Sequence, residues 1–156
     1  MKEITFEINS NEELWSLIDK NLNHILVHKF TPNLAIEWWA TDIKMKDGEL
    51  FKGLKVRNME FDITTDLIGL KKLIELNTHQ LRIYQFDKPI PGTLSLEHLP
   101  ENNRDKILAQ NGLKHIFFCN FEFLTVASLS DEFIAEIKNN EVFKDRIEER
   151  KKNLSE

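Results

Sequence analysis

The sequence predicts a single α+β domain: a mostly antiparallel sheet of about five or six strands, with about three or four helices packed mainly on one face. Three observations predict this class. Short runs that alternate apolar and polar residues are separated by segments with helical spacing. The dipeptide Asp47-Gly48 stands between two strand-like runs, as in an antiparallel hairpin. The 156 residues contain no Gly/Ser-rich linker and no internal repeat, so we expect one domain over 1–150 and a solvated tail over 151–156.

The first part of the chain is predicted to run strand, helix, strand. Apolar and polar residues alternate in KEITFEI (2–8), which indicates a first strand. Ser10 and Glu13 form a capping-box pattern, so a helix is expected to begin there, and apolar residues at helical spacing continue to Leu22. The run HILVHKFT (24–31) predicts a second strand.

Helices and strands are expected to alternate in the second half as well. One long segment, 113–129, is apolar on both alternating faces. This pattern is typical of a central strand covered on both sides, and the length leaves room for a bulge or bend near Asn120. The other expected elements are a helix over 65–77, a strand over 81–86, a helix over 100–112 and a last helix from Ser130 that breaks near Asn139-Asn140.

Charge and composition narrow the function classes. A formal net charge of −5 and a sequence pI of about 5.6 oppose direct nucleic-acid binding, which relies on Lys and Arg meeting phosphates. No run approaches the roughly 18–20 apolar residues of a membrane span, and the N-terminus shows no signal-peptide pattern. We therefore expect a cytoplasmic protein without a membrane partner. The single cysteine, Cys119, excludes an internal disulfide and is expected to pack in the core among phenylalanines.

The most specific functional signal is the pair of tryptophans in AIEWWATDI (35–43). A two-residue turn at Asp47-Gly48 would pair Trp38 with Arg57 and place Trp39 on the opposite face of the hairpin. We expect the Trp39 face to bind a partner, with the tryptophan as anchor and the neighbouring acids attracting a basic protein. The residues predicted to form this face are Trp39, Glu37, Asn58, Glu60 and Asp62.

Alternatives to this interpretation stay open. In one, Trp39 packs on Leu54 and Val56 as a small apolar cluster, and the acids are only solvated. In another, the three acids of the face bind Mg²⁺ or Mn²⁺ for a hydrolase, although no Lys or His completes such a site. In a third, a small molecule binds between the sheet and the loop over 87–100.

No recognisable catalytic motif, cofactor motif or metal-ligand set is found along the sequence. His24 and His28 are four residues apart, but in a strand-like run they are expected to be ordinary surface or edge histidines. His115 belongs to no pattern. A small acidic domain without a catalytic set favours binding over catalysis. The resulting expectation is a cytoplasmic protein-binding module, similar in general character to bacterial immunity proteins, that occludes a basic partner such as a toxin nuclease through the Trp39 face.

Overall fold

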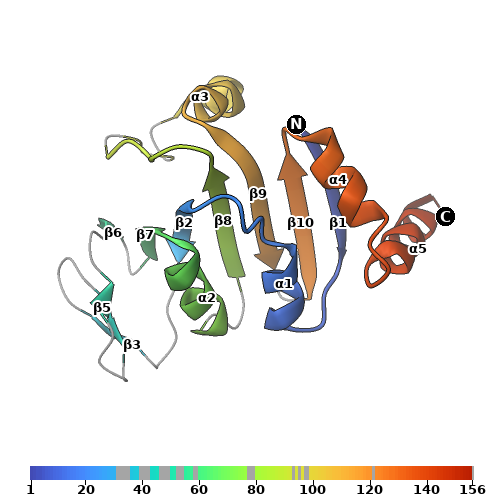
Figure 1. Cartoon of the computed structure of the whole chain (residues 1–156), viewed down its shortest axis with the longest axis horizontal. Helices are drawn as coiled ribbons and strands as arrows, with labels where there is room; N and C mark the ends of the chain where they lie inside the picture. Colours follow the sequence, from blue (N-terminus) through green and yellow to red (C-terminus); the bar gives the residue numbers. More distant parts are fainter. Residues whose placement is uncertain are drawn as a thin grey trace.

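The chain folds around one antiparallel sheet (Figure 1). The computed structural model describes residues 1–30, 36–38, 43–45, 50–51, 55–57, 60–76, 80–92, 94, 96, 99–120 and 122–155. Strands of six to eight residues form the body of the sheet, and the three-residue strand β6 extends one edge. In spatial order the strands are β1 (Lys2–Glu7), β10 (Phe123–Ser128), β9 (Leu113–Asn120), β8 (Gln80–Phe86), β2 (His24–Phe30), β7 (Glu60–Thr65) and β6 (Lys55–Arg57).

Helices cover the two faces of this sheet unequally (Figure 1). The first face carries α1 (Asn11–Leu17), α2 (Leu67–Leu76), α4 (Asp131–Lys138) and α5 (Lys144–Ser155). The second face carries the 3₁₀ helix η2 (Glu101–Asn103) and α3 (Arg104–Gln110). The predicted α+β class is therefore confirmed. The described residues form five α-helices, more than predicted, because the last expected helix is divided in two.

The division lies where the sequence predicts it, at Asn139-Asn140. Asn139 caps the C-terminus of α4, and the carbonyl oxygen of Asn140 accepts the N–H of Phe143 at 3.1 Å before α5 begins. Asparagine favours such turns because its side chain competes with helical backbone hydrogen bonds. α5 then continues through 151–155, where a tail was expected, and the side chains of 151–154 are exposed.

The predicted N-cap of the first helix, Ser10, is confirmed, while Glu13 reaches back to the residue before the cap and has a second role. Ser10 Oγ accepts the N–H of Glu13 at 3.2 Å, and Glu13 Oε1 accepts the N–H of Asn9 at 2.7 Å. The guanidinium of Arg146 on α5 donates to both carboxylate oxygens of Glu13, at 2.8 and 3.0 Å. This bidentate pair lowers the pKa of Glu13 and connects α5 to α1.

The larger core fills the space between the sheet and the four helices of the first face. On β1 it contains Ile4 and Phe6, and on β9 it contains Phe117 and Cys119. All four side chains are buried, which confirms the core position predicted for Cys119. Burial also raises the pKa of its thiol, as expected for a cysteine that packs as a small hydrophobe.

The segment 113–129 is not one long strand. It forms the hairpin of β9 and β10, which reverses after Asn120, with Phe123 opposite Asn120. The buried positions change from odd numbers on β9 to even numbers on β10, as a chain reversal with one buried face requires. Both faces of the segment read as apolar because both strands lie inside the sheet, so composition alone does not distinguish one strand from two.

The predicted pairing around Asp47-Gly48 is wrong. β3 (Ile36–Trp38) pairs with β4 (Ile43–Met45), and β4 pairs with β5 (Leu50–Phe51), in a separate three-stranded sheet. Trp38 therefore lies opposite Ile43 and not opposite Arg57, which pairs with Glu60. The strands on the two sides of Asp47-Gly48, β4 and β5, do pair antiparallel as the turn signal predicts, but they are short, and the first run also pairs with itself through β3 and β4.

His28 is not a surface or edge histidine. Its strand, β2, lies between β8 and β7, and its side chain is buried. The imidazole meets the ring of Tyr84 on β8 edge-on, with the centroids 6.1 Å apart. The sheet order makes β2 an interior strand, and the local sequence does not reveal that order.

Candidate functional site

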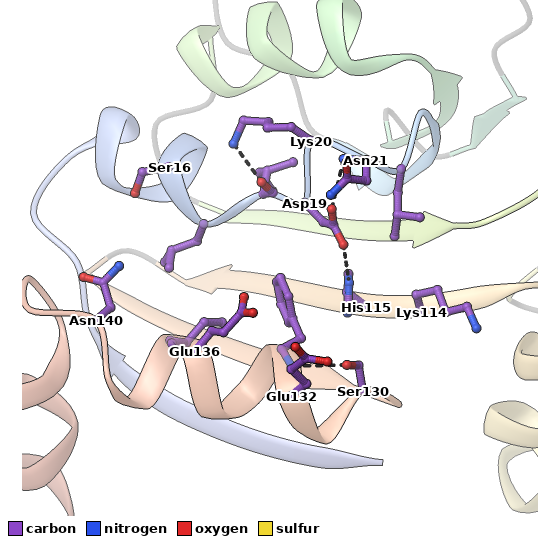
Figure 2. A pocket seen from close by; sticks show the side chains of 15 residues that line it. Ser16, Asp19, Lys20, Asn21, Lys114, His115, Ser130, Glu132, Glu136 and Asn140 are labelled. Carbon is purple, nitrogen blue, oxygen red and sulfur yellow. Dashed lines mark hydrogen bonds and ion pairs between the residues drawn. The ribbon is translucent and has the colours of Figure 1, made fainter.

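A hollow of about 730 Å³ opens between the segment that leaves α1 and the near side of α4. Figure 2 shows α4 on one side of this hollow and the segment with Asp19, Lys20 and Asn21 on the other, with His115 of β9 between them. We call it the α1–α4 groove and define it by residues 16–22, Lys114, His115 and the α4 side chains that face it.

The groove exists because α1 ends earlier than its apolar spacing predicts. Ile18 is extended, with φ −63° and ψ 135°, so the residues up to Leu22 leave the helix and cross the sheet. The ammonium group of Lys20 donates to the carbonyl oxygens of Trp15 and Ile18 and lies 4.4 Å from the centre of the Trp15 ring. Lys20 thereby adds a donor to two carbonyls at the C-terminal end of α1, and burial lowers its pKa.

A buried polar row of the sheet holds this segment in place. Gln85, His115 and Ser128 face one another across β8, β9 and β10, and each is at most 3% exposed. Gln85 Oε1 accepts the N–H of Asp19 at 3.0 Å, and Gln85 Nε2 donates to the Asp19 carbonyl at 2.9 Å. Nε2 also donates to the carbonyl of Leu22 at 3.3 Å. One amide side chain thus pairs the backbone of the segment as a neighbouring strand would.

His115 joins three elements that meet at the groove. Its Nε2 lies 2.9 Å from Asp19 Oδ2, and its Nδ1 lies 2.7 Å from Ser128 Oγ. The ring of Phe133 on α4 stacks on the imidazole, with the centroids 3.8 Å apart and the planes 18° from parallel. The side chain of His115 is only 4% exposed, whereas that of Asp19 is 20% exposed.

The pKa shifts of His115 and Asp19 decide the protonation state of each side chain. Burial lowers the pKa of His115 and outweighs the opposing effect of Asp19, so the imidazole is neutral near neutral pH. Burial acts to raise the pKa of Asp19, but hydrogen bonds from Asn21 and His115 outweigh it and the net pKa is lowered. Asp19 is therefore ionised and accepts a hydrogen bond from His115 Nε2–H. The lone pair of Nδ1 accepts a hydrogen bond from the Ser128 hydroxyl group.

The Ser128–His115–Asp19 set has the residue types of a hydrolase triad but not its accessibility. Ser128 is 1% exposed, and its hydroxyl oxygen already accepts the N–H of Ser130 at 2.9 Å. A nucleophile must reach a substrate carbonyl at the surface of a cleft, with donors placed for the developing oxyanion. The buried hydroxyl does not meet the first condition, and the three residues form a hydrogen-bond network that positions Asp19.

The walls of the groove are acidic and its floor is apolar. Glu132 and Glu136 lie one turn apart on α4, and Asp19 faces them from the other side (Figure 2). Within the described parts of the chain, no cation pairs with Glu132 or Glu136. The two lysines of the groove are engaged elsewhere: Lys20 with the carbonyls of α1, and Lys114 with Asp87 at 3.3 Å. The floor contains Leu17, Ile18, Phe133 and Ile137.

The residues predicted from the sequence to bind a partner do not lie in this groove. Trp39 and Asn58 are outside the described residues. Glu37 belongs to β3 of the three-stranded sheet, whereas Glu60 and Asp62 belong to β7 of the main sheet. The hairpin that would have united these residues on one face is not formed. Figure 1 places β3 at the opposite end of the long axis of the molecule from α5.

The proposed metal site finds no counterpart in the described ranges, which contain no group of three or more His, Cys, Asp or Glu side chains placed to hold a metal ion. No helix in the same ranges is long and apolar enough to span a bilayer. Comparison of the chain with family models, curated proteins and solved structures gives no match. The functional argument therefore depends on the geometry of the groove.

Sequence reasoning missed the groove, but it contained one usable signal. Gln85 and His115 occupy buried positions of their strands, in phase with Leu81, Ile83 and Phe117. A polar side chain at a core position must have a hydrogen-bond partner, because an unpaired buried polar group costs about 1–3 kcal/mol. Two such residues in neighbouring strands therefore indicate a segment above the sheet that supplies the partners.

The network predicts a loss of stability at mildly acidic pH. As the pH falls through 6.5, the ordinary pKa of histidine, His115 takes up a proton in the unfolded chain but stays neutral in the folded chain, where its pKa is lower. The unfolded state then binds more protons, so the free energy of unfolding decreases until the pH reaches the lowered pKa of the folded state. Urea unfolding at a series of pH values measures this decrease. The variant His115→Gln should show a flatter profile over the same window, and an equally steep profile would contradict the assignment.

Proposed function

We propose that the protein is a protein-binding module whose α1–α4 groove binds a cationic segment of a basic partner. The observation that carries the proposal is the two carboxylates on α4, Glu132 and Glu136, which pair with no cation among the residues the structure describes and face the ionised Asp19 across an apolar floor. The formal net charge of −5 acts in the same direction by attracting a basic protein at long range.

The groove has the composition of an interaction site. Of the floor residues, Phe133 is only half-buried and offers apolar surface, whereas Leu17, Ile18 and Ile137 already belong to the core; aromatic side chains are enriched at binding hot spots. The carboxylates surround this floor and select for Lys or Arg, which sets partner choice and association rate more than raw affinity. A hollow of about 730 Å³ accommodates a few side chains of a partner rather than a whole domain.

The finer proposal is that binding occludes the partner, as an inhibitor of immunity type does. A basic active site, such as that of a nuclease that must bind phosphates, exposes the Lys and Arg side chains that an acidic groove recognises. The acidic character of the whole chain and the absence of an exposed nucleophile in the Ser128–His115–Asp19 network support a blocking role over a catalytic one.

The test uses the full chain as bait, with two double variants of equal charge change. Glu132→Lys/Glu136→Lys reverses the groove acids, and Glu148→Lys/Glu149→Lys reverses two exposed acids of α5 outside the groove. We expect the unaltered chain and the α5 variant to capture the same basic protein from a lysate of the native host. The groove variant should bind that purified protein about a hundredfold more weakly, because like charges would then face each other.

Thermal unfolding of both variants shows whether the fold is retained. Equal loss of binding in both variants would show that only net charge matters, and capture by all three baits alike would remove the groove as the binding surface. The inhibitor role requires one further result. Addition of the chain must suppress the activity of the captured protein, and the groove variant must fail to do so.

A further inference from the structure

We propose that Asp19 is the anchor that receives the principal cationic side chain of the partner, and that a proton on His115 releases it. This inference rests on the proposed function and specifies its chemistry and its control. Asp19, His115, Ser128 and Gln85 form one connected network at the floor of the groove, and the placement of their atoms carries the argument.

Asp19 is a preorganised acceptor. Oδ1 accepts the N–H of Asn21 at 3.0 Å, Oδ2 accepts His115 Nε2–H at 2.9 Å, and Gln85 holds the backbone on both its N–H and its carbonyl. The side chain of Asn21 also hydrogen-bonds the carboxylate, and the side chain of Asp19 remains 20% exposed toward the groove (Figure 2). A carboxylate already held in place loses little conformational entropy when a guanidinium or ammonium group binds to it.

The other side of the imidazole is arranged to accept a proton. Ser128 Oγ lies 2.7 Å from His115 Nδ1 and 3.3 Å from the carbonyl oxygen of Lys114. When His115 is neutral, the hydroxyl donates to Nδ1. When Nδ1 is protonated, Nδ1–H donates to Oγ and the hydroxyl proton turns to the Lys114 carbonyl. Both states leave every buried donor and acceptor paired, so the ring can be protonated without an orphaned polar group.

The charge on His115 decides what Asp19 can bind. A neutral imidazole adds no positive charge beside the carboxylate, which already interacts with the ammonium group of Lys20, whereas an imidazolium at 2.9 Å compensates the negative charge and repels a further cation. Two uncharged side chains contact the His115 ring: Phe133 on α4 stacks on it, and Ser128 on β10 hydrogen-bonds to its Nδ1. The charged groups that line the groove beside the ring are Asp19 and Lys20 after α1, Lys114 on β9, and Glu132 and Glu136 on α4. At the start of α4, Asp131 pairs with Lys2 of β1, and both side chains are exposed.

Burial favours the neutral ring and keeps the groove in its binding form near neutral pH. Because linkage is reciprocal, a cation bound to Asp19 must in turn make His115 harder to protonate. The inference therefore predicts two linked results: weaker binding at mildly acidic pH, and a lower pKa of His115 in the complex.

The experiment measures both on the full chain with a defined probe. The probe is a short synthetic amphipathic peptide of Lys and Leu, and the control peptide carries Glu in place of Lys. We expect the Lys peptide to bind about fivefold more weakly once the pH lies below the pKa of folded His115 than at about pH 7.5, and the Glu peptide not to bind. NMR titration of the His115 ring should give a lower pKa with the Lys peptide than without it.

Variants separate the anchor from the surrounding acids. Asp19→Asn should lose most of the binding at both pH values, whereas Glu132→Lys/Glu136→Lys should weaken binding but keep its dependence on pH. Ser128→Ala, which cannot stabilise the imidazolium through Nδ1, should move the binding transition to lower pH. If a variant does not fold, the ring titration of the unaltered chain with the two peptides still decides.

Three results would overturn the inference: an Asp19→Asn variant that binds the peptide as tightly as the unaltered chain, a His115 pKa unaffected by the peptide, or no binding of the peptide at all. None of them contradicts the proposed function, which fails only if the partner captured from the host ignores reversal of the groove acids. The two proposals can thus fail separately.

Discussion

Replacing Phe117 with alanine is expected to lower the free energy of unfolding by about 3–5 kcal/mol, the range found for deletion of a buried aromatic ring. Phe117 lies on β9 in the interior of the sheet and is fully buried. Its ring meets His115 edge-on at 6.4 Å and Phe133 edge-on at 6.1 Å between centroids. The cavity left by alanine would border the polar row, so the surrounding side chains cannot close it without breaking hydrogen bonds. Urea unfolding measures the change as a shift of the midpoint at constant slope.

Phe123→Ala is the matched control. Phe123 begins the next strand, β10, but it is 43% exposed and contacts only the guanidinium of Arg150, 5.1 Å from its ring centre, among the cations described. Its loss should cost less than about 1 kcal/mol. Similar losses for the two variants would mean that the core between the sheet and the helices is not packed as described.

Replacing Gln85 with alanine is expected to cost about 2–4 kcal/mol, a large effect for a polar side chain. The change removes the three hydrogen bonds to the backbone of Asp19 and Leu22. The Asp19 carbonyl keeps the N–H of Leu22 at 3.2 Å, whereas the Asp19 N–H and the Leu22 carbonyl lose the partner that Gln85 supplies at this half-buried site. A second consequence concerns the groove. Without Gln85 the Asp19 segment is held only by its side-chain contacts, so peptide binding should weaken even where the variant remains folded.

Gln80→Ala tests whether this effect belongs to the network. Gln80 lies on the same strand, β8, but it is exposed and makes one side-chain hydrogen bond, from its Nε2 to Asn120 Oδ1 at 3.2 Å. We expect a change within about 0.5 kcal/mol. Comparison of the two glutamine variants by urea unfolding and by hydrogen exchange of the Asp19 amide would show the difference. An unprotected Asp19 amide in the unaltered chain would be inconsistent with the structure.

The helices were predictable where the chain states its own boundaries. Ser10 with Glu13, and Ser130 before Phe133, are caps whose side chains accept helical N–H groups, and these interactions involve only residues three apart. Gly112 likewise marks the end of α3, because its φ of 92° suits glycine and a Cβ there would lie 2.5 Å from Asp87 Oδ1. These hydrogen bonds and steric limits involve residues close together in the chain, so they can be predicted from a single sequence.

The candidate site was not predictable in the same way. Its anchor, Asp19, is brought to His115 across 96 positions of the chain, and α1 must end before Leu22 for the contact to form. The prediction of a Trp39 face was wrong for a related reason. Alternation shows which residues of one strand share a face, but which residues of two strands share a face depends on how the strands pair. Two long runs around Asp47-Gly48 suggested one pairing, and the chain adopts another.

The sequence by itself therefore determined the α+β class, the helix caps, the core position of Cys119 and the acidic character of the molecule, since these depend on periodicity, local hydrogen bonding and composition. Only the tertiary structure decided which polar residues meet. Gln85 and His115 are isolated polar residues in apolar strands until the sheet order places them beside each other and the end of α1 places Asp19 above them. That arrangement depends on strand order and on the long-range packing of α1 and α4, and neither is encoded within any short stretch of the chain.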